Sequence, residues 1–241
     1  MSHEIPFKDF SQHEHDTWGM LFKRQAEKRS KQIYSTFDRG IALLNFNASH
    51  IPDLNETNKR LAKLTGFRAV PVAGLEKDRS FFEMMARREF PIGNFIRERE
   101  DLSYTPAPDV FHDLYGHIPF LTDKAYADFS AKLGQSACKF SEQEEGVKQF
   151  SRLYWFGVEF PLIKTPEGKR IFGAGIASSH GECAFALSDD PEVRPFDPER
   201  IRNHDFRIDE FQRILYLIEN VEQLYSCLPE YEKKVERSLK H

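Results

Sequence analysis

Apolar residues recur three and four residues apart over most of the chain, which is the spacing of one face of an α-helix. Trp18, Leu21 and Phe22 follow this spacing, so we expect a helix over residues 17–31. Further predicted helices cover 53–64, 78–89, 109–116, 123–133, 147–160, 208–224 and 231–239. Residues that cap or break helices mark several of these ends: Asp53, Gly66, Asp78, Asp109 and Gly134.

Strands are predicted only in short pieces. We expect them at 67–72 and 95–97, with a hairpin at 162–172 that turns at 166–168. Helices do not alternate regularly with these strands, and no GxGxxG or GxxxxGK[ST] loop is present, which disfavours a nucleotide-binding fold. The sequence therefore predicts a mostly α fold with a few short β-strands (α+β).

Composition narrows the class of protein. The 241 residues carry a net charge of −4 with both signs interleaved, which argues against a general nucleic-acid binder. No run approaches a membrane span, and the polar N-terminus does not resemble a secretory signal. Three widely spaced cysteines fit a reducing cytoplasm. We expect a flexible segment at 1–16 and a single domain at 17–241. With 22 Phe, much of its core must be aromatic.

Two histidines in one short segment are the first candidates for chemistry. His112 and His117 lie five residues apart in the segment PDVFHDLYGHIP. On a regular α-helix five residues rotate by about 140°, so the pair would not share a face. We expect Gly116 and Pro119 to end the helix and let His117 turn back toward His112. The zinc-protease pattern HExxH has a different spacing, and Asp113 stands where its glutamate would be.

Glu159 is the best candidate for a third ligand. It follows a helix rich in aromatic residues, where an unpaired charge would cost several kcal/mol. A divalent cation would remove that cost, and two imidazoles with one carboxylate are typical of non-haem Fe(II) oxygenases. Taken singly, either histidine could be a hydrogen-bonded core residue. Glu159 could equally pair with Arg152 or Arg170.

The flanking sequence favours the joint interpretation because the chain resembles the pterin-dependent aromatic amino acid hydroxylases. The resemblance covers about half the chain, from near Gly66 to Leu187, and continues more weakly on either side. It is closest to the short bacterial phenylalanine 4-hydroxylases. Four segments in the family's order carry it: TGFRAVPVAGL (65–75), TPAPDVFHDLYGHIPF (105–120), LYWFGVEF (153–160) and FGAGIASSHGE (172–182).

The resemblance implies a role for each matched residue. The iron ligands would be His112, His117 and Glu159. The pterin would stack on Phe81, which would otherwise be read as core. Its polar edge would face Gly74, Leu75 and Asp113. The residues implied for the amino acid substrate are Arg97, Thr105, Trp155, Gly175, Ser178 and Glu182.

Three of these residues have simpler interpretations. Without the resemblance, Glu182 would be a solvated charge on a short helix. Without the resemblance, Arg97 would be a surface charge among charged neighbours. Trp155 would be a core residue of its helix. Three positions depart from the family pattern or from its animal members, namely Pro161, His180 and Pro91. None of them removes a ligand.

The resemblance implies an Fe(II)- and tetrahydropterin-dependent monooxygenase that uses O₂ to hydroxylate an aromatic amino acid, with L-phenylalanine to L-tyrosine as the expected reaction. Residues 17–241 would be its catalytic domain. Three alternatives stay open: the same chemistry on tryptophan or at the meta position of phenylalanine, a zinc hydrolase with the same ligands, and a non-catalytic binding module. We expect a cytoplasmic monomer whose partners are the amino acid and the pterin, without nucleic acid or membrane.

Overall fold

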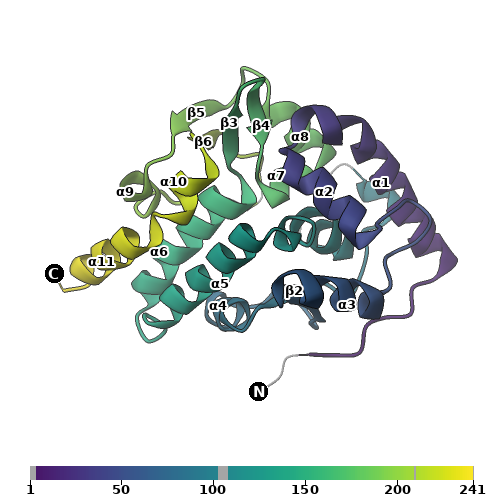
Figure 1. The fold of residues 1–241 in the computed structure, drawn as a ribbon, viewed down its shortest axis with the longest axis horizontal. Coiled ribbons are helices and arrows are strands. Elements are labelled where there is room, and N and C mark those ends of the chain that lie inside the picture. Colours follow the sequence, from purple (N-terminus) through teal and green to yellow (C-terminus); the bar gives the residue numbers. More distant parts are fainter. Residues whose placement is uncertain (1–3, 103–107, 209, 241) are drawn as a thin grey trace.

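A computed structural model describes residues 4–102, 108–208 and 210–240 of the chain. Helices form most of the molecule, and α5 and α6 pack against each other through its middle (Figure 1). Helix α1 lies at one end and the C-terminal helix α11 at the other. This arrangement confirms the predicted mostly helical α+β fold.

The first three helices are α1 (Gln12–Gln32), α2 (Ser35–Leu44) and α3 (Leu54–Thr65). Helix α1 begins five residues before the expected start at 17, because Ser11 and Glu14 form a capping box at its N-terminus. The backbone N–H of Ile5 donates to the carbonyl of Pro71, so the chain before α1 is attached to the domain. Helix α3 confirms the prediction for 53–64.

A parallel pair of strands, β1 (Arg68–Pro71) and β2 (Glu89–Ile92), flanks α4 (Asp78–Ala86). Three predictions were wrong here. Helix α4 does not reach residue 89, because Arg88 adopts a left-handed conformation (φ 60°) that ends the turn. Residues 95–97 form no strand; instead the N–H of Arg97 donates to the side chain of Asp109. Asp78 is the first residue of α4 and not its cap.

Helices α5 (Lys124–Cys138) and α6 (Glu144–Tyr154) form the central layer. Gly134 does not end α5 as expected but lies inside it, where the helix crosses α4. A Cβ there would lie 2.5 Å from the backbone nitrogen of Ala86, so the close crossing requires glycine. Four short helical segments, labelled η, complete this part: η1 (Arg99–Asp101), η2 (His112–His117), η3 (Phe120–Thr122) and η4 (Trp155–Glu159).

A four-stranded sheet in the order β4-β3-β6-β5 packs beside the helices. The antiparallel pair β3 (Leu162–Thr165) and β4 (Gly168–Ile171) confirms the predicted hairpin. The predicted helix at 208–224 was wrong, because Ile214–Ile218 is strand β6, parallel to both β3 and β5 (Glu192–Pro195). A short apolar run is compatible with a buried strand or a buried helix. Here its pairing with β3 makes it a strand.

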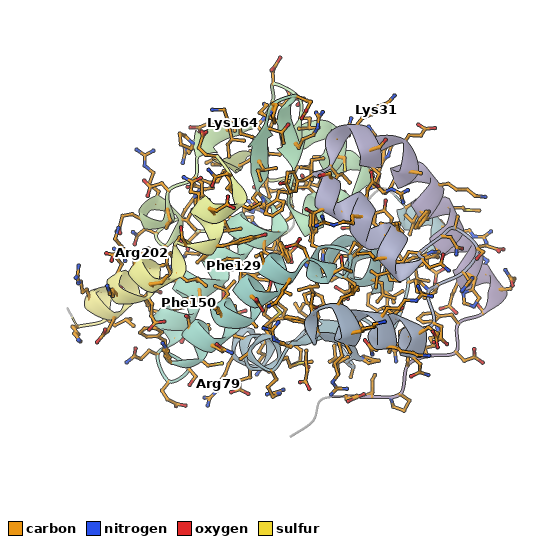
Figure 2. The ribbon with its side chains drawn as sticks, in the orientation of Figure 1. Lys31, Arg79, Phe129, Phe150, Lys164 and Arg202 are labelled. Atoms are coloured by element: carbon orange, nitrogen blue, oxygen red, sulfur yellow. The ribbon has the colours of Figure 1, made fainter. Side chains whose placement is uncertain are left out.

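The remaining helices are α7 (Ala174–Ser178), α8 (His180–Ala186), α9 (Pro198–Ile201), α10 (Val221–Tyr225) and α11 (Leu228–Ser238). Phenylalanines fill much of the core; Phe129 and Phe150 lie between helices, while Lys31, Arg79 and Lys164 lie at the periphery (Figure 2). Among the described residues, no helix is both long and apolar enough to span a bilayer.

Candidate metal centre

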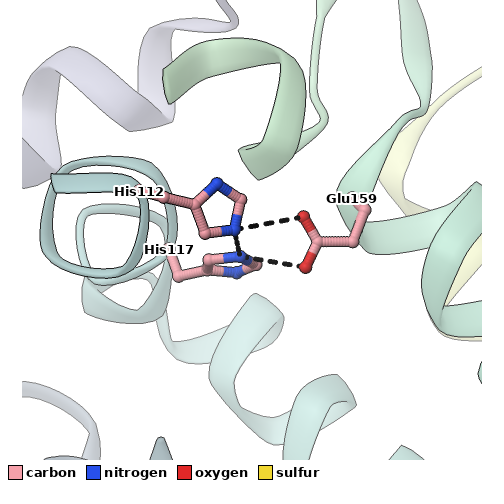
Figure 3. A group of neighbouring side chains, drawn as sticks. All are labelled: His112, His117 and Glu159. Atoms are coloured by element: carbon pink, nitrogen blue, oxygen red, sulfur yellow. Dashed lines mark hydrogen bonds and ion pairs between the residues drawn. The ribbon is translucent and has the colours of Figure 1, made fainter. Parts of the chain in front are cut away.

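His112, His117 and Glu159 converge on one point inside the molecule (Figure 3). The Nε2 atoms of the two histidines lie 3.2 Å apart. Nε2 of His117 lies 3.0 Å from Oε1 of Glu159, and Nε2 of His112 lies 3.9 Å from Oε2. Within the described ranges, this is the one group of three such side chains close enough to share a metal ion.

The backbone explains how histidines five residues apart can face the same point. Segment η2 is a π-helix, in which the N–H of Ile118 donates to the carbonyl of Asp113, five residues earlier. This wider winding places residues five apart one turn from each other. The helix was expected to end near Gly116 and Pro119, and it ends at His117, but the π-helical winding and not that end brings the two histidines together. Segment η4, which ends at Glu159, is also a π-helix.

The donor atoms fit a divalent ion. Two nitrogens bound about 2.1 Å from one ion lie roughly 3.0–3.4 Å apart when they subtend about 90–110° at it. The observed 3.2 Å separation of the imidazole nitrogens falls in this range. Oε2 of Glu159 is buried without a hydrogen-bond partner, as expected of an oxygen that awaits a cation. Arg152 pairs instead with Glu145 and Asp205.

Neighbouring groups hold the histidine rings in orientation. Nδ1 of His112 lies 2.9 Å from Oγ of Ser178, which leaves its Nε2 toward Glu159. Nδ1 of His117 lies 3.5 Å from the hydroxyl of Tyr154, and Phe90 stacks on the same ring at 4.5 Å between centroids. Such contacts fix the tautomer and direction of a ligating imidazole.

The charge states also suit a metal. Burial lowers the pKa of His112 to about 4, so the imidazole is neutral at physiological pH. Burial alone would raise the pKa of Glu159, but the adjacent histidines, His117 foremost, hold it below its ordinary value. A neutral imidazole and an ionised carboxylate are the forms that bind metals. Burial raises the pKa of the neighbouring Asp113 to about 7.

Arg97 lies next to this cluster and is almost fully buried, so its interpretation as a surface charge was wrong. Its Nε and Nη2 each donate to a different oxygen of Asp109 at 2.8 Å, which makes the pair bidentate. Asp109 is itself completely buried and also accepts from the backbone N–H of His112. Although its burial would raise the pKa of Asp109, the Arg97 guanidinium keeps that pKa below the usual range.

The residues expected to contact a pterin come from three parts of the chain: helix α4, the loop that precedes it, and segment η2. Phe81 is half-buried on α4 and packs edge-on against Tyr154, with ring centroids 4.8 Å apart. Gly74 and Leu75 lie in the loop that precedes α4, where the Leu75 side chain is 78% exposed. Asp113 is buried and accepts a hydrogen bond from the backbone N–H of Gly93.

Among the residues expected to contact the substrate, Gly175 lies beside Glu159. A Cβ on Gly175 would lie 2.9 Å from Oε2 of Glu159, so only glycine fits beside this carboxylate. Glu182 is buried on α8, and burial raises its pKa to about 7. Trp155 is half-buried in η4. Thr105 lies outside the described residues. His180 is not part of the metal-binding group.

Three residues at the site were not identified as site residues from the sequence. Asp109 was expected only to cap a helix. Its position twelve residues after Arg97 is the one sequence feature that could have suggested their ion pair. Tyr154 contacts His117 and Phe81, and Gln212 accepts a hydrogen bond from Trp155. Nothing in the sequence pattern marks the last two.

Comparisons with known proteins identify close relatives. Residues 1–241 match the model of the biopterin-dependent aromatic amino acid hydroxylase family. The phenylalanine-4-hydroxylase of Caulobacter vibrioides is 40% identical over 219 residues, which cover 90% of this chain and 74% of that protein. The enzyme of the same name from Chromobacterium violaceum is 39% identical over 92% of this chain and 75% of its own length.

Solved structures show the same fold. The C. violaceum phenylalanine hydroxylase with bound Fe(III) has a TM-score of 0.94 at 36% identity and covers 99% of this chain and 87% of that one. The structure of that enzyme with iron(III) and 7,8-dihydrobiopterin has a TM-score of 0.91 at 37% identity, with 97% and 87% covered.

Proposed function

Because the chain belongs to the biopterin-dependent aromatic amino acid hydroxylase family, we propose that it converts L-phenylalanine to L-tyrosine with Fe(II), a tetrahydropterin and O₂. The observation that carries this proposal is the buried group of His112, His117 and Glu159, whose donor atoms fit one divalent ion. Two imidazoles and one carboxylate leave coordination positions for other ligands, as this chemistry requires.

The three side chains would hold the iron, and bound iron with a reduced pterin would supply the activation of O₂. The protein's own contribution is position. The rings of Phe81, Phe90 and Tyr154 form an aromatic cluster that continues to His117, and the half-buried ring of Phe81 would stack on the pterin. Gly74, Leu75 and Asp113 would then meet its polar edge.

Arg97 would bind the carboxylate of the amino acid. Asp109 accepts hydrogen bonds from two nitrogens of Arg97, so the guanidinium is oriented before the substrate arrives. Trp155, Gly175, Ser178 and Glu182 would line the rest of the substrate pocket, together with Thr105. The half-buried indole of Trp155 offers an apolar wall to an aromatic ring.

We further propose that this is one catalytic domain that acts as a cytoplasmic monomer. Its partners would be the amino acid and the pterin, with no nucleic acid or membrane among them. Interleaved charges and three cysteines without disulfides support this view.

Product analysis tests the proposal. The purified protein, loaded anaerobically with Fe(II), is mixed with tetrahydrobiopterin, O₂ and phenylalanine, tyrosine or tryptophan. Mass spectrometry and chromatographic standards then identify the products. We expect tyrosine from phenylalanine as the main product. Meta-tyrosine or hydroxytryptophan as the main product would overturn the assigned ring position or substrate.

A matched variant separates iron chemistry from the other interpretations. His117→Ala should fold but lose both iron retention and hydroxylation, and full activity in this variant would contradict the iron assignment. Zinc-dependent hydrolysis without pterin turnover would favour the hydrolase. Wild-type protein that binds iron and pterin but forms no product from any of the three amino acids would favour a binding module.

A further inference from the structure

Gln212 is a buried side chain just before β6 whose amide is hydrogen-bonded on both ends. Its Nε2 donates to the backbone carbonyls of Arg207 at 2.7 Å and Glu210 at 3.1 Å. Its Oε1 accepts from Nε1 of Trp155 at 2.9 Å. Its backbone N–H donates to the carboxylate of Glu182. One residue therefore ties together a surface loop and two of the residues proposed to line the substrate pocket.

The indole that Gln212 holds stands close to the metal centre. Trp155 opens the π-helix η4 that ends at Glu159. One side of the indole stacks on Phe206, with centroids 4.3 Å apart and planes 10° from parallel. It also packs against Phe160, whose ring would touch a Cβ on Gly175. Rotation of this indole would thus change the wall of the pocket beside the iron ligands.

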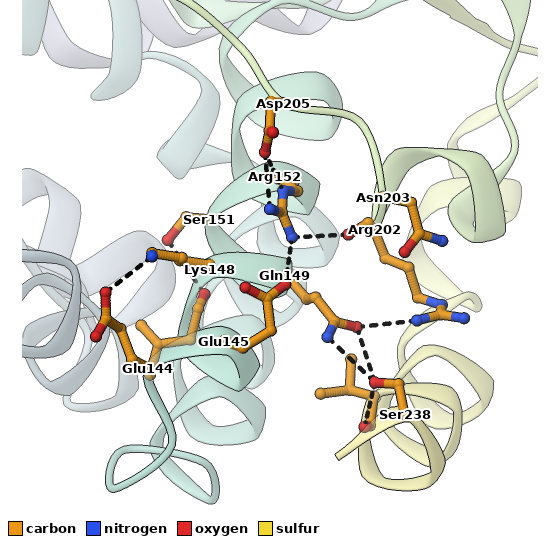
Figure 4. A network of polar contacts seen from close by, with 12 residues as sticks. Glu144, Glu145, Lys148, Gln149, Ser151, Arg152, Arg202, Asn203, Asp205 and Ser238 are labelled. Atoms are coloured by element: carbon orange, nitrogen blue, oxygen red, sulfur yellow. Dashed lines mark hydrogen bonds and ion pairs between the residues drawn. The ribbon is translucent and has the colours of Figure 1, made fainter. Parts of the chain in front are cut away.

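The loop that carries Phe206 is attached at its other end by Arg152. Nε and Nη2 of Arg152 donate to Oδ1 of Asp205 at 3.0 and 2.7 Å, and its Nη1 donates to the carbonyl of Arg202 (Figure 4). These contacts hold the loop against α6 at the point where it follows α9. They do not reach the indole, whose N–H donates to Gln212 alone among the described residues.

We propose that Gln212 is a positioning residue for the hydroxylation, which fixes the Trp155 indole and the loop residues 206–208 and 210–212 as one wall of the substrate pocket. It touches neither iron nor substrate and acts through Trp155 and Glu182. This inference rests on the proposed function for its effect on turnover, but the anchoring itself can be measured without turnover.

Gln212→Met tests the proposal because methionine has a similar length and no hydrogen-bonding amide. Gln149→Met is the matched control. Gln149 is also a buried glutamine, but its amide joins α6 to Arg202 and Ser238, away from the metal centre (Figure 4). Both variants lose a buried amide and should lose similar stability, but only Gln212→Met removes a hydrogen bond to Trp155.

The first readout is the indole N–H resonance of each tryptophan in a ¹⁵N-labelled sample. The protein has two tryptophans, and Trp18 donates to the carbonyl of Asn47, which makes it an internal reference. In Gln212→Met the chemical shift of the Trp155 indole N–H should change, while that of Trp18 should not. In Gln149→Met neither chemical shift should change. An unchanged Trp155 resonance in Gln212→Met would overturn the anchoring.

The second readout is kinetic. Gln212→Met should raise the KM for phenylalanine about tenfold, the effect of one lost positioning contact, with the pterin KM and iron content unchanged. Gln149→Met should leave all three unchanged. An unchanged phenylalanine KM in folded Gln212→Met, or equal increases for phenylalanine and pterin, would overturn the positioning role.

If Gln212→Met does not fold, Trp155→Phe replaces it. This variant removes the indole donor and leaves the bonds from Gln212 to Arg207 and Glu210. It should raise the phenylalanine KM in the same selective way, and a wild-type KM would overturn the proposal. If the wild-type protein hydroxylates nothing, the proposed function fails, while the indole resonances still decide whether Gln212 holds Trp155.

Discussion

Two buried carboxylates near the metal centre differ in charge because their neighbours differ. Glu159 faces two imidazoles, and its pKa lies below the ordinary value. Glu182 has one described donor, the backbone N–H of Gln212, while its Oε2 is buried without a partner. Burial therefore dominates at Glu182 and raises its pKa to about 7. One carboxylate is ionised and suited to a cation, and the other keeps its proton up to about pH 7.

The proton on Glu182 makes stability depend on pH. As pH rises from near 4.5, the usual glutamate value, to about 7, the unfolded chain loses this proton before the folded protein does. The free energy of unfolding should therefore fall across that window, by about 2–3 kcal/mol at most. Glu182→Gln should remove this part of the decline. Urea unfolding at about pH 5 and about pH 8 measures it, with Glu222→Gln as an exposed control. The same decline in Glu182→Gln as in wild type would contradict the assignment.

Arg97 is expected to set the affinity for the amino acid. Arg97→Lys keeps the positive charge but loses the planar pair of donors that matches a carboxylate. The KM for phenylalanine should rise about tenfold or more, and the pterin KM should change little. Steady-state kinetics with each substrate varied in turn measures this. Arg99→Lys changes a nearby, more exposed arginine and should affect neither constant. Equal effects on both constants in Arg97→Lys would argue against its role.

Among the elements, the two π-helical segments matter most, because each carries metal-binding side chains. Segment η2 packs against α7, which also supplies Ser178 to His112. The contact is close at Gly116, where a Cβ would lie 2.7 Å from the carbonyl oxygen of Ala174. Since backbone cannot move aside as a flexible side chain can, this glycine sets how near η2 approaches α7.

Gly116→Ala should separate η2 from α7. We expect a loss of about 1–3 kcal/mol in the free energy of unfolding, together with weaker binding of Fe(II). Urea unfolding and anaerobic titration with Fe(II) measure the two effects. Gly157→Ala is the control, because its Cβ in η4 would meet only the end of the Leu224 side chain at 3.1 Å. Wild-type iron affinity in a folded Gly116→Ala protein would show that this contact does not support the centre.

Elements with strong local signals were predictable from the sequence. Helix α3 has its Asp53 cap and Gly66 end, and the hairpin has its turn. Strand β6 was not predictable, because its five residues are stabilised by pairing with β3 and β5, far away in the chain. The π-helical winding also left no local signal. The five-residue spacing of the histidines was visible, but its structural meaning depends on the packing of η2 against α7.

The residues of the site likewise divide into those that the sequence marks and those that it does not. His112, His117 and Glu159 could be selected by chemistry, and the structure brings them together. Gln212 could not be selected, since a single glutamine has no charge or periodicity to mark it. Its importance comes from where the chain passes after α9, which is a property of the tertiary structure.

For the whole molecule, the aromatic excess forms the framework around the metal centre. Tyr115 lies in η2, and Phe111, the residue before η2, stacks on its ring. Phe37 and Phe22 pack edge-on against the same ring. These rings pack against η2 in addition to its contact with α7. Phe22, Phe37 and Phe111 thus hold a segment that carries two of the proposed metal ligands.

Removal of the metal should destabilise the entire domain. Three buried ligands from η2 and η4 meet at one ion, so Fe(II) bound to the folded state alone should stabilise it by about 2.7 kcal/mol at a concentration of about 100 times Kd. Chelation should then lower the Tm by roughly 5–10 °C in a protein of this size. Differential scanning calorimetry measures the shift. His117→Ala should show no such shift, and a shift of equal size in that variant would place the ion elsewhere.

Asp109 joins two functions that are otherwise separate, since one carboxylate orients the Arg97 guanidinium and also receives the backbone N–H of His112. Any movement of Arg97 upon binding an amino acid is thereby passed to the segment that holds the metal. Thermodynamic linkage makes such a connection reciprocal: whatever factor iron adds to the affinity for the amino acid, the amino acid adds to the affinity for iron. The affinity for iron measured with and without the amino acid therefore reports whether Asp109 couples the two sites.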